Sequence, residues 1–232
     1  MHLKFLQTGT LLKIALILQL HSFFVLLLVC LFVSDAHAED DWGSSHNLLL
    51  KYKLNEDWFV LSRSNLAVRR DNEELFLGYT GASLGYQLNK QWSTRLGYRY
   101  ARFRIGEDWR TERRPMAEIY YADMLDGWRL TSRSRAEFRF PDWRDNDVRL
   151  RQEFTTTAPW KLTSLEMKPF IEEEIFYSTR NDWVEANWFT IGLSFFPLEN
   201  LKVKFGYRHN RQRIRGEFIT RHTLVTGFNV FF

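Results

Sequence analysis

The chain has 232 residues and a formal net charge of +4, with 26% charged residues. This length suits a single domain, and such a near balance of charge is not the footprint of a nucleic-acid-binding protein. The hydropathy is too low for a bundle of membrane helices. After the first 38 residues no long apolar run remains, so any segment that spans a membrane must be built from alternating strands.

Residues 1–38 have the composition of a secretory signal peptide. A weakly basic start precedes residues 14–33, which are almost wholly apolar, and Ala36-His37-Ala38 then gives the small-x-small pattern that a signal peptidase reads. We predict cleavage between Ala38 and Glu39, which leaves residues 39–232 as the mature domain. An uncleaved membrane anchor is the alternative, because the apolar run approaches the ~20 residues that span a bilayer.

The only cysteine, Cys30, lies in the predicted signal peptide. The mature chain therefore has no thiol for a disulfide or for a cysteine metal site. No motif supports a metal or cofactor site, and we expect neither.

Alternation with a period of two residues runs through almost all of the mature chain. From Trp128 to Phe140, apolar or small residues share one face, while the other carries four arginines, Thr131 and Glu137. A helix would spread these charges around its circumference, whereas a strand sorts them onto one side. Eleven such segments are predicted: 45–54, 58–70, 75–88, 92–105, 114–124, 128–140, 147–157, 167–178, 186–197, 201–214 and 220–232.

The connections between these segments alternate in kind. Short turns of related sequence occupy 54–58, 88–92, 125–128 and 198–201. Longer, charged connections lie between them, at Asp71 to Glu74, Gly106 to Arg113, Pro141 to Asn146, Thr179 to Glu185 and Arg215 to Glu217. Transmembrane barrels have short turns on the periplasmic side and long polar loops outside. The pattern therefore predicts an antiparallel, up-and-down transmembrane β-barrel.

Two further features favour a membrane barrel over a soluble, lipocalin-like one. Trp58, Trp92 and Trp128 each begin a strand directly after a short turn, which predicts a ring of indoles at one membrane interface. Phe228, Val230 and Phe232 alternate up to the final carboxylate, like the C-terminal insertion signal of outer-membrane proteins. We therefore expect the bacterial outer membrane as location. Its lipid and lipopolysaccharide, the barrel assembly machinery and periplasmic chaperones are the expected partners.

A weak internal repeat leads to a family resemblance. Tyr52-Lys53-Leu54-Asn55 is echoed by Tyr86-Gln87-Leu88-Asn89, and Gly97-Tyr98-Arg99-Tyr100 by Gly206-Tyr207-Arg208-His209. With these motifs and its terminal aromatic residue, the mature chain resembles a family of bacterial outer-membrane barrels known as domain of unknown function twenty-four ninety. The resemblance covers most of the chain. It implies a fold and a location, but no chemistry.

Eleven segments is an awkward number, because single-chain bacterial barrels have even strand counts. With a periplasmic C-terminus, the first of eleven strands would begin at the outer rim, which leaves the N-terminus on the wrong side of the membrane. We therefore expect that residues 39–45 thread down inside the barrel or that one segment is assigned wrongly. The expected number of strands is ten to twelve.

The charged faces of the strands are predicted to line the lumen. The basic residues with this parity are Lys51, Lys53, Arg63, Arg69, Arg95, Arg99, Arg129, Arg133, Arg135, Arg139, Arg149, Arg151, Lys202, Lys204 and Arg208. Their acidic companions are Glu118, Glu137, Glu153, Glu172 and Glu174. Because this parity puts Glu173 on the lipid side, the register of that strand is doubtful.

Two interpretations of such a lumen stay open. Arginines and glutamates can interlock as a packed core without a pore, as in small barrels of about eight strands. Alternatively, a barrel of ten to twelve strands holds water, and its fixed positive charge selects small anionic solutes, whose carboxylate or phosphate groups suit guanidinium forks. The architecture then resembles small channels for acidic oligosaccharides.

A lipid-modifying hydrolase of the lipase or lipid A deacylase type is the third hypothesis. Such an enzyme needs an activated nucleophile or water beside a base. The mature chain offers His46, His209 and His222, all with outward parity near the predicted outer rim. No catalytic constellation accompanies them, so we expect a protein that is not an enzyme.

Overall fold

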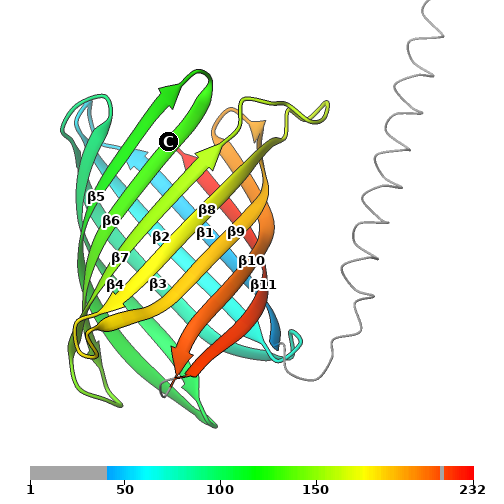
Figure 1. Cartoon of the computed structure of the whole chain (residues 1–232). Coiled ribbons are helices and arrows are strands. Elements are labelled where there is room, and N and C mark those ends of the chain that lie inside the picture. The colour runs from blue at the N-terminus through cyan, green and yellow to red at the C-terminus, as the bar shows by residue number, and fades with distance from the viewer. Residues whose placement is uncertain (1–40, 215–216) are drawn as a thin grey trace, which may run out of the picture. The chain divides into compact units, whose positions relative to one another are not determined.

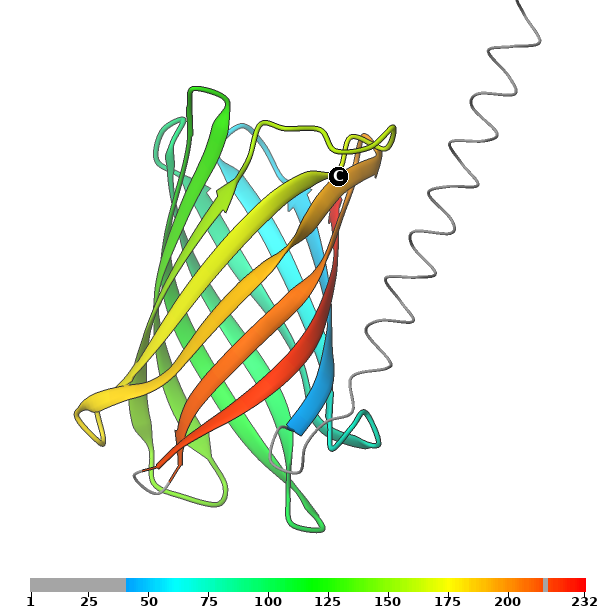
Figure 2. The same cartoon turned by 45° about the vertical axis from the view of Figure 1, so that its right-hand side comes forward.

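The computed structural model describes residues 41–214 and 217–232. These residues form a closed all-β barrel of eleven strands in the order β1-β11-β10-β9-β8-β7-β6-β5-β4-β3-β2 (Figures 1 and 2). The predicted fold class is confirmed. The predicted signal peptide, 1–38, and its cleavage site between Ala38 and Glu39 lie outside the described residues. The strands are β1 (Asp41–Lys53), β2 (Trp58–Arg69), β3 (Glu74–Gln87), β4 (Trp92–Ile105), β5 (Asp108–Leu125), β6 (Trp128–Pro141), β7 (Asp147–Thr157), β8 (Lys168–Ser178), β9 (Trp183–Leu198), β10 (Leu201–Ile214) and β11 (Glu217–Phe231).

The barrel closes through a parallel pair of strands. Every other neighbouring pair is antiparallel, but β1 runs parallel to β11 from the pair Asp41–Arg221 to the pair Lys51–Phe231. An odd number of strands requires this, because the first and last strands then run in the same direction. Both expected explanations of the count were wrong: all eleven segments are strands, and the residues from Asp41 onward belong to β1.

The two ends of the barrel are named here by the chain terminus that each holds. The C-terminal rim contains Phe232, and the N-terminal rim contains Asp41, where β1 begins (Figure 1). The predicted contrast between short turns and long loops is wrong. Connections at the C-terminal rim occupy 54–57, 88–91, 126–127, 158–167 and 199–200, and those at the N-terminal rim occupy 70–73, 106–107, 142–146, 179–182 and 215–216.

The strands extend into each of the charged segments that were predicted as loops, and farthest into 106–113. β5 begins at Asp108, and the turn before it consists of Gly106 and Glu107. Gly106 has a φ of +64°, which glycine adopts at little cost. The backbone ladder between β4 and β5 therefore extends to the pair Ile105–Asp108.

Two turns at the C-terminal rim confirm the internal repeat. The Asn55 side-chain oxygen accepts hydrogen bonds from the backbone N–H groups of Asp57 (3.0 Å) and Trp58 (2.8 Å). Asn89 accepts the same pair of bonds from Gln91 and Trp92, both at 2.9 Å. An asparagine that caps its own turn in this way fixes the geometry of a hairpin.

The outer wall of the barrel is apolar and its inner wall is charged. On β4, Leu96 is 70% exposed whereas Arg99 is 3% exposed. This is the inverse of a soluble barrel, in which the apolar face is buried. Trp58 and Trp92 lie on the outer wall at the C-terminal rim, each against a tyrosine of the next strand, Tyr86 or Tyr121, at 4.8 Å between ring centroids. Within residues 41–214 and 217–232, no helix is long and apolar enough to cross a membrane.

Candidate functional site: the charged interior

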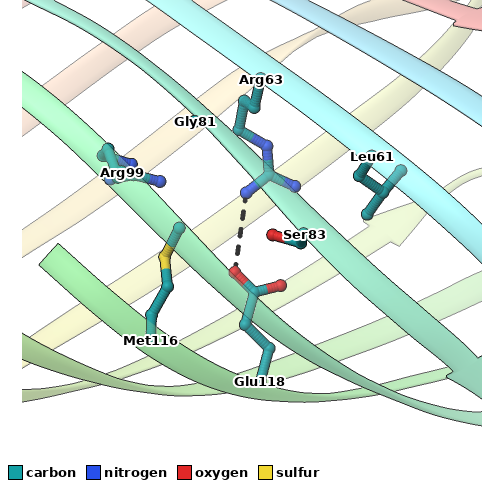
Figure 3. Close-up of a pocket in the computed structure, with 7 residues that line it drawn as sticks. All are labelled: Leu61, Arg63, Gly81, Ser83, Arg99, Met116 and Glu118. Carbon is teal, nitrogen blue, oxygen red and sulfur yellow. Dashed lines mark ion pairs between the residues drawn. The ribbon is translucent and has the colours of Figure 1, made fainter.

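Ion pairs in the interior join strands that are not neighbours. Arg63 of β2 reaches Glu118 of β5 at 3.8 Å, and Figure 3 shows these two side chains pointing toward each other. Arg99 of β4 lies 3.6 Å from Glu137 of β6. Since other strands separate the members of each pair, these side chains meet across the inside of the barrel.

Glu137 is the centre of this interior, and its side chain is 0% exposed. Five guanidinium groups surround its carboxylate, those of Arg99 (3.6 Å), Arg114 (3.4 Å), Arg135 (3.1 Å), Arg149 (2.7 Å) and Arg151 (2.9 Å). These arginines come from β4, β5, β6 and β7. A buried charge is tolerable only when it is paired and hydrogen-bonded, and here four strands supply the partners.

Glu118 is the centre of a second group of ion pairs, on the side of β2 and β4. We call Glu137 and Glu118, each with its arginines, the two nodes of the interior. Its carboxylate lies 2.6 Å from Arg135 and 3.2 Å from Arg95, in addition to its contact with Arg63. Arg135 contacts both Glu118 and Glu137 and so connects the two nodes.

A third group of acids lies between β7 and β10. Arg133 forms ion pairs with Glu153 and, at 3.3 Å, with Glu174, which also accepts Arg151 at 2.7 Å. Glu172 pairs with Lys204 at 2.9 Å and with Arg208 at 3.2 Å. The doubt about the register of β8 is resolved: Glu172 and Glu174 face the interior, and Glu173 faces out.

Aromatic rings support several of these cations. The guanidinium carbon of Arg99 lies 4.1 Å from the ring centre of Tyr79, and that of Arg151 lies 4.3 Å from Phe176. An aromatic face attracts a cation and replaces part of its lost hydration. The sequence prediction omitted these rings, because aromatic residues were assigned to the lipid-facing side.

The prediction also missed Glu112 and Arg114. Both are buried, they pair with each other, and Arg114 continues to Glu137. Glu112 fell in a segment predicted as a loop. The alternation of Glu112, Arg114, Met116 and Glu118 was the signal that could have identified them.

Of the twenty residues predicted to line the lumen, the structure brings sixteen into ion pairs. These are Arg63, Arg69, Arg95, Arg99, Arg133, Arg135, Arg139, Arg149, Arg151, Lys204, Arg208, Glu118, Glu137, Glu153, Glu172 and Glu174. For the other four, Lys51, Lys53, Arg129 and Lys202, no ion pair is found among the described residues.

Arg129 and Lys202 belong to a cationic group at the C-terminal rim, which we call the basic mouth. It consists of Lys51, Lys53, Arg129, Lys168 and Lys202, all within three residues of the strand ends at this rim. Within the described part of the chain, none of these five cations forms an ion pair. The positive charge of the interior is therefore least balanced here.

Little space is left between the charged side chains. A pocket lined by Leu61, Arg63, Gly81, Ser83, Arg99, Met116 and Glu118 (Figure 3) leaves about 10 Å³ open to the centre of a water molecule. That is room for roughly one water. The charged side chains around it are buried: Arg99, Glu118, Arg135 and Glu137 are each at most 4% exposed.

Comparisons with known proteins agree with this architecture. A family model described as a protein of unknown function (DUF2490) matches residues 42–218. The chain belongs to the DUF2490 family. Among solved structures, the porin NanC in a rhombohedral crystal form is similar, with a TM-score of 0.50 and 14% identity over 77% of this chain and 92% of that one. At this identity the likeness shows the fold alone. A search of curated proteins finds no match.

The histidines of this DUF2490 barrel lie on its outer wall. His46 shares a hydrogen bond of 2.8 Å with the hydroxyl of Thr226, and the His222 ring bonds to the Tyr207 hydroxyl. Trp42 stacks on His222 at 5.0 Å between ring centres. Within residues 41–214 and 217–232, no group of three His, Cys, Asp or Glu side chains is placed to hold a metal ion.

One loop of the barrel is fastened by a carboxylate. Asp142, directly after β6, accepts hydrogen bonds from the backbone N–H (3.0 Å) and the hydroxyl (2.8 Å) of Thr111. These bonds favour the charged form and hold the pKa of Asp142 below its ordinary value. The contact joins the 142–146 connection to β5.

Proposed function

We propose that this DUF2490 protein is an outer-membrane barrel whose lumen is held closed by ion pairs, and that it serves as a structural element of the envelope. The single observation that carries the proposal is Glu137, fully buried among five arginines. Small barrels are filled by side chains in this way. The apolar outer wall and the indoles at the C-terminal rim support a location in a lipid bilayer.

Planar-bilayer conductance of the refolded mature protein tests this proposal. We expect no steady openings from the wild type. The double variant Arg99→Ser, Arg135→Ser removes two large side chains beside Glu137 and should open a water-filled path that conducts. Heat-modifiable migration on gels is the control that both proteins are folded barrels. Steady wild-type openings would refute a closed lumen.

A small anion channel is the second candidate, and the basic mouth favours it. Fixed positive charge without acidic partners attracts anions to a pore entrance. Lys51 and Lys202 make no ion pair within the described residues, so Lys51→Glu and Lys202→Glu leave the interior network untouched. Under this hypothesis the wild type conducts with anion selectivity, and the double variant shifts the reversal potential in a salt gradient toward cations. A reversal potential equal to that of the wild type would exclude the mouth as selectivity element.

A further inference from the structure

Glu173 is a carboxylate on the apolar outer wall. Its neighbours Glu172 and Glu174 pair with cations of the interior, so Glu173 points to the opposite side of β8. Phe154 of β7 and Phe189 of β9 lie directly opposite it in the sheet, and both are exposed. A charged group is thus surrounded by side chains suited to lipid.

The depth of Glu173 follows from the strand register. One row of paired residues runs across the sheet through Trp92, Tyr121, Ser132, Phe154, Glu173, Phe189, His209, His222 and Trp42. With strands about 4.8 Å apart and tilted by about 40°, its eight steps rise about 25 Å, the height of the apolar band of a membrane barrel. Glu173 is the fifth of the nine residues, so it lies near the midplane, with an indole at either end of the row.

Other polar side chains lie beside Glu173 on the same wall. The amide of Asn187 donates a hydrogen bond to its carboxylate. On the neighbouring strands, Gln152 bonds to Ser134 at 2.5 Å and donates to Ser132 at 2.8 Å. We call these five residues the β6–β9 polar patch.

The hydrogen-bonding capacity of this patch is not met within one chain. A carboxylate accepts about four hydrogen bonds, and Asn187 supplies the one side-chain donor found for Glu173 among the described residues. For the second N–H of the Asn187 amide, no acceptor is found among the described residues. Acyl chains offer neither donors nor acceptors, and unsatisfied polar groups are costly in lipid.

We propose that the β6–β9 polar patch is an interface with a second copy of this chain. The patch holds an acceptor, Glu173, next to an amide donor, Asn187, and therefore matches itself across a two-fold axis. In such a dimer each Glu173 carboxylate accepts from the Asn187 amide of the other copy, and the exposed Phe154 and Phe189 pack around the contact. The inference rests on the proposed membrane location, but not on whether the lumen conducts.

Cysteine cross-linking in membranes tests the interface, because residues 41–232 contain no cysteine. Ile175→Cys lies two residues from Glu173 on the same face, and Leu96→Cys is the matched control on the exposed wall of β4. We expect a bismaleimide to join two copies of the Ile175→Cys protein in outer-membrane vesicles and not two copies of the control. Equal cross-linking of both, or cross-linking of Ile175→Cys to other proteins alone, would overturn the proposal.

Replacement of the carboxylate gives the second measurement. Glu173→Leu should weaken self-association in lipid nanodiscs about tenfold, the effect of losing one charged hydrogen-bonding partner on each side. Thr80→Leu, an outward polar position on β3, should leave it unchanged. Heat-modifiable migration reports insertion separately: a chain that does not insert refutes the membrane location, and an inserted wild type that stays monomeric refutes only the interface.

Discussion

Glu137 holds more partners than any other acid described in the interior, and its replacement is the most direct test of the network. Glu137→Gln removes the carboxylate that five arginines share, so their mutual repulsion is offset less. Breaking a buried ion pair from one side costs about 3–5 kcal/mol, and we expect a loss of this size in urea unfolding of the barrel in vesicles. Glu107→Gln, in the exposed β4–β5 turn, should have no effect. An unchanged midpoint for Glu137→Gln would contradict the central role of this residue.

The Asp142 contact gives a pH-dependent prediction at the N-terminal rim. Its pKa is lowered in the folded protein, so its stabilising contribution is present above the unfolded value of about 3.9 and is lost as pH falls through the folded pKa. Protection of the Thr111 amide against hydrogen exchange, corrected for intrinsic rates, should therefore be constant from about pH 5 to 8 and fall in stronger acid. Asp142→Ala should remove the protection already at neutral pH. Persistent protection in that variant would show that the loop is held by other contacts.

At the scale of single elements, the two asparagine turns make a paired experiment. Asn89→Ala removes the acceptor for two backbone N–H groups, and at about 0.5–1.5 kcal/mol per hydrogen bond we expect a loss of about 1 kcal/mol, since water replaces part of the contact. Asn55→Ala should give the same loss, and Lys90→Ala, in the same turn, none. Urea unfolding measures all three. Unequal effects of the two asparagines would show that the turns, though alike in geometry, differ in energy.

The segments that form strands could be predicted from the sequence, but the residues at which the strands begin and end were harder to predict. Alternation locates β6 within one residue, because Trp128 and Phe140 face lipid while the arginines face inward. It fails for the first residues of β5, where Arg110, Glu112 and Arg113 put charges on both faces. Near the rim both faces meet water or headgroups, so the polarity contrast on which the pattern depends disappears.

At the scale of the whole molecule, the alternation along each strand predicted which residues face the interior. It did not predict which of them form ion pairs with each other. Arg63 meets Glu118, which is three strands away in the chain. Such a contact depends on the barrel's shear and diameter, which no local pattern contains. The parallel β1–β11 pair was unforeseen for the same reason: closure is a property of all the strands together.

Parallel closure also determines on which side of the membrane each end of the chain lies. An odd number of passes sends the two ends of the polypeptide to opposite compartments, with Phe232 at one rim and Asp41 at the other. With the C-terminus in the periplasm, an epitope inserted before Asp41 should be stained by antibody on intact cells, whereas one appended to Phe232 should need permeabilised cells. The reverse pattern would place the basic mouth on the cell surface. With its C-terminus in the periplasm, the barrel would serve as a display scaffold that carries a fused N-terminal segment on the cell surface.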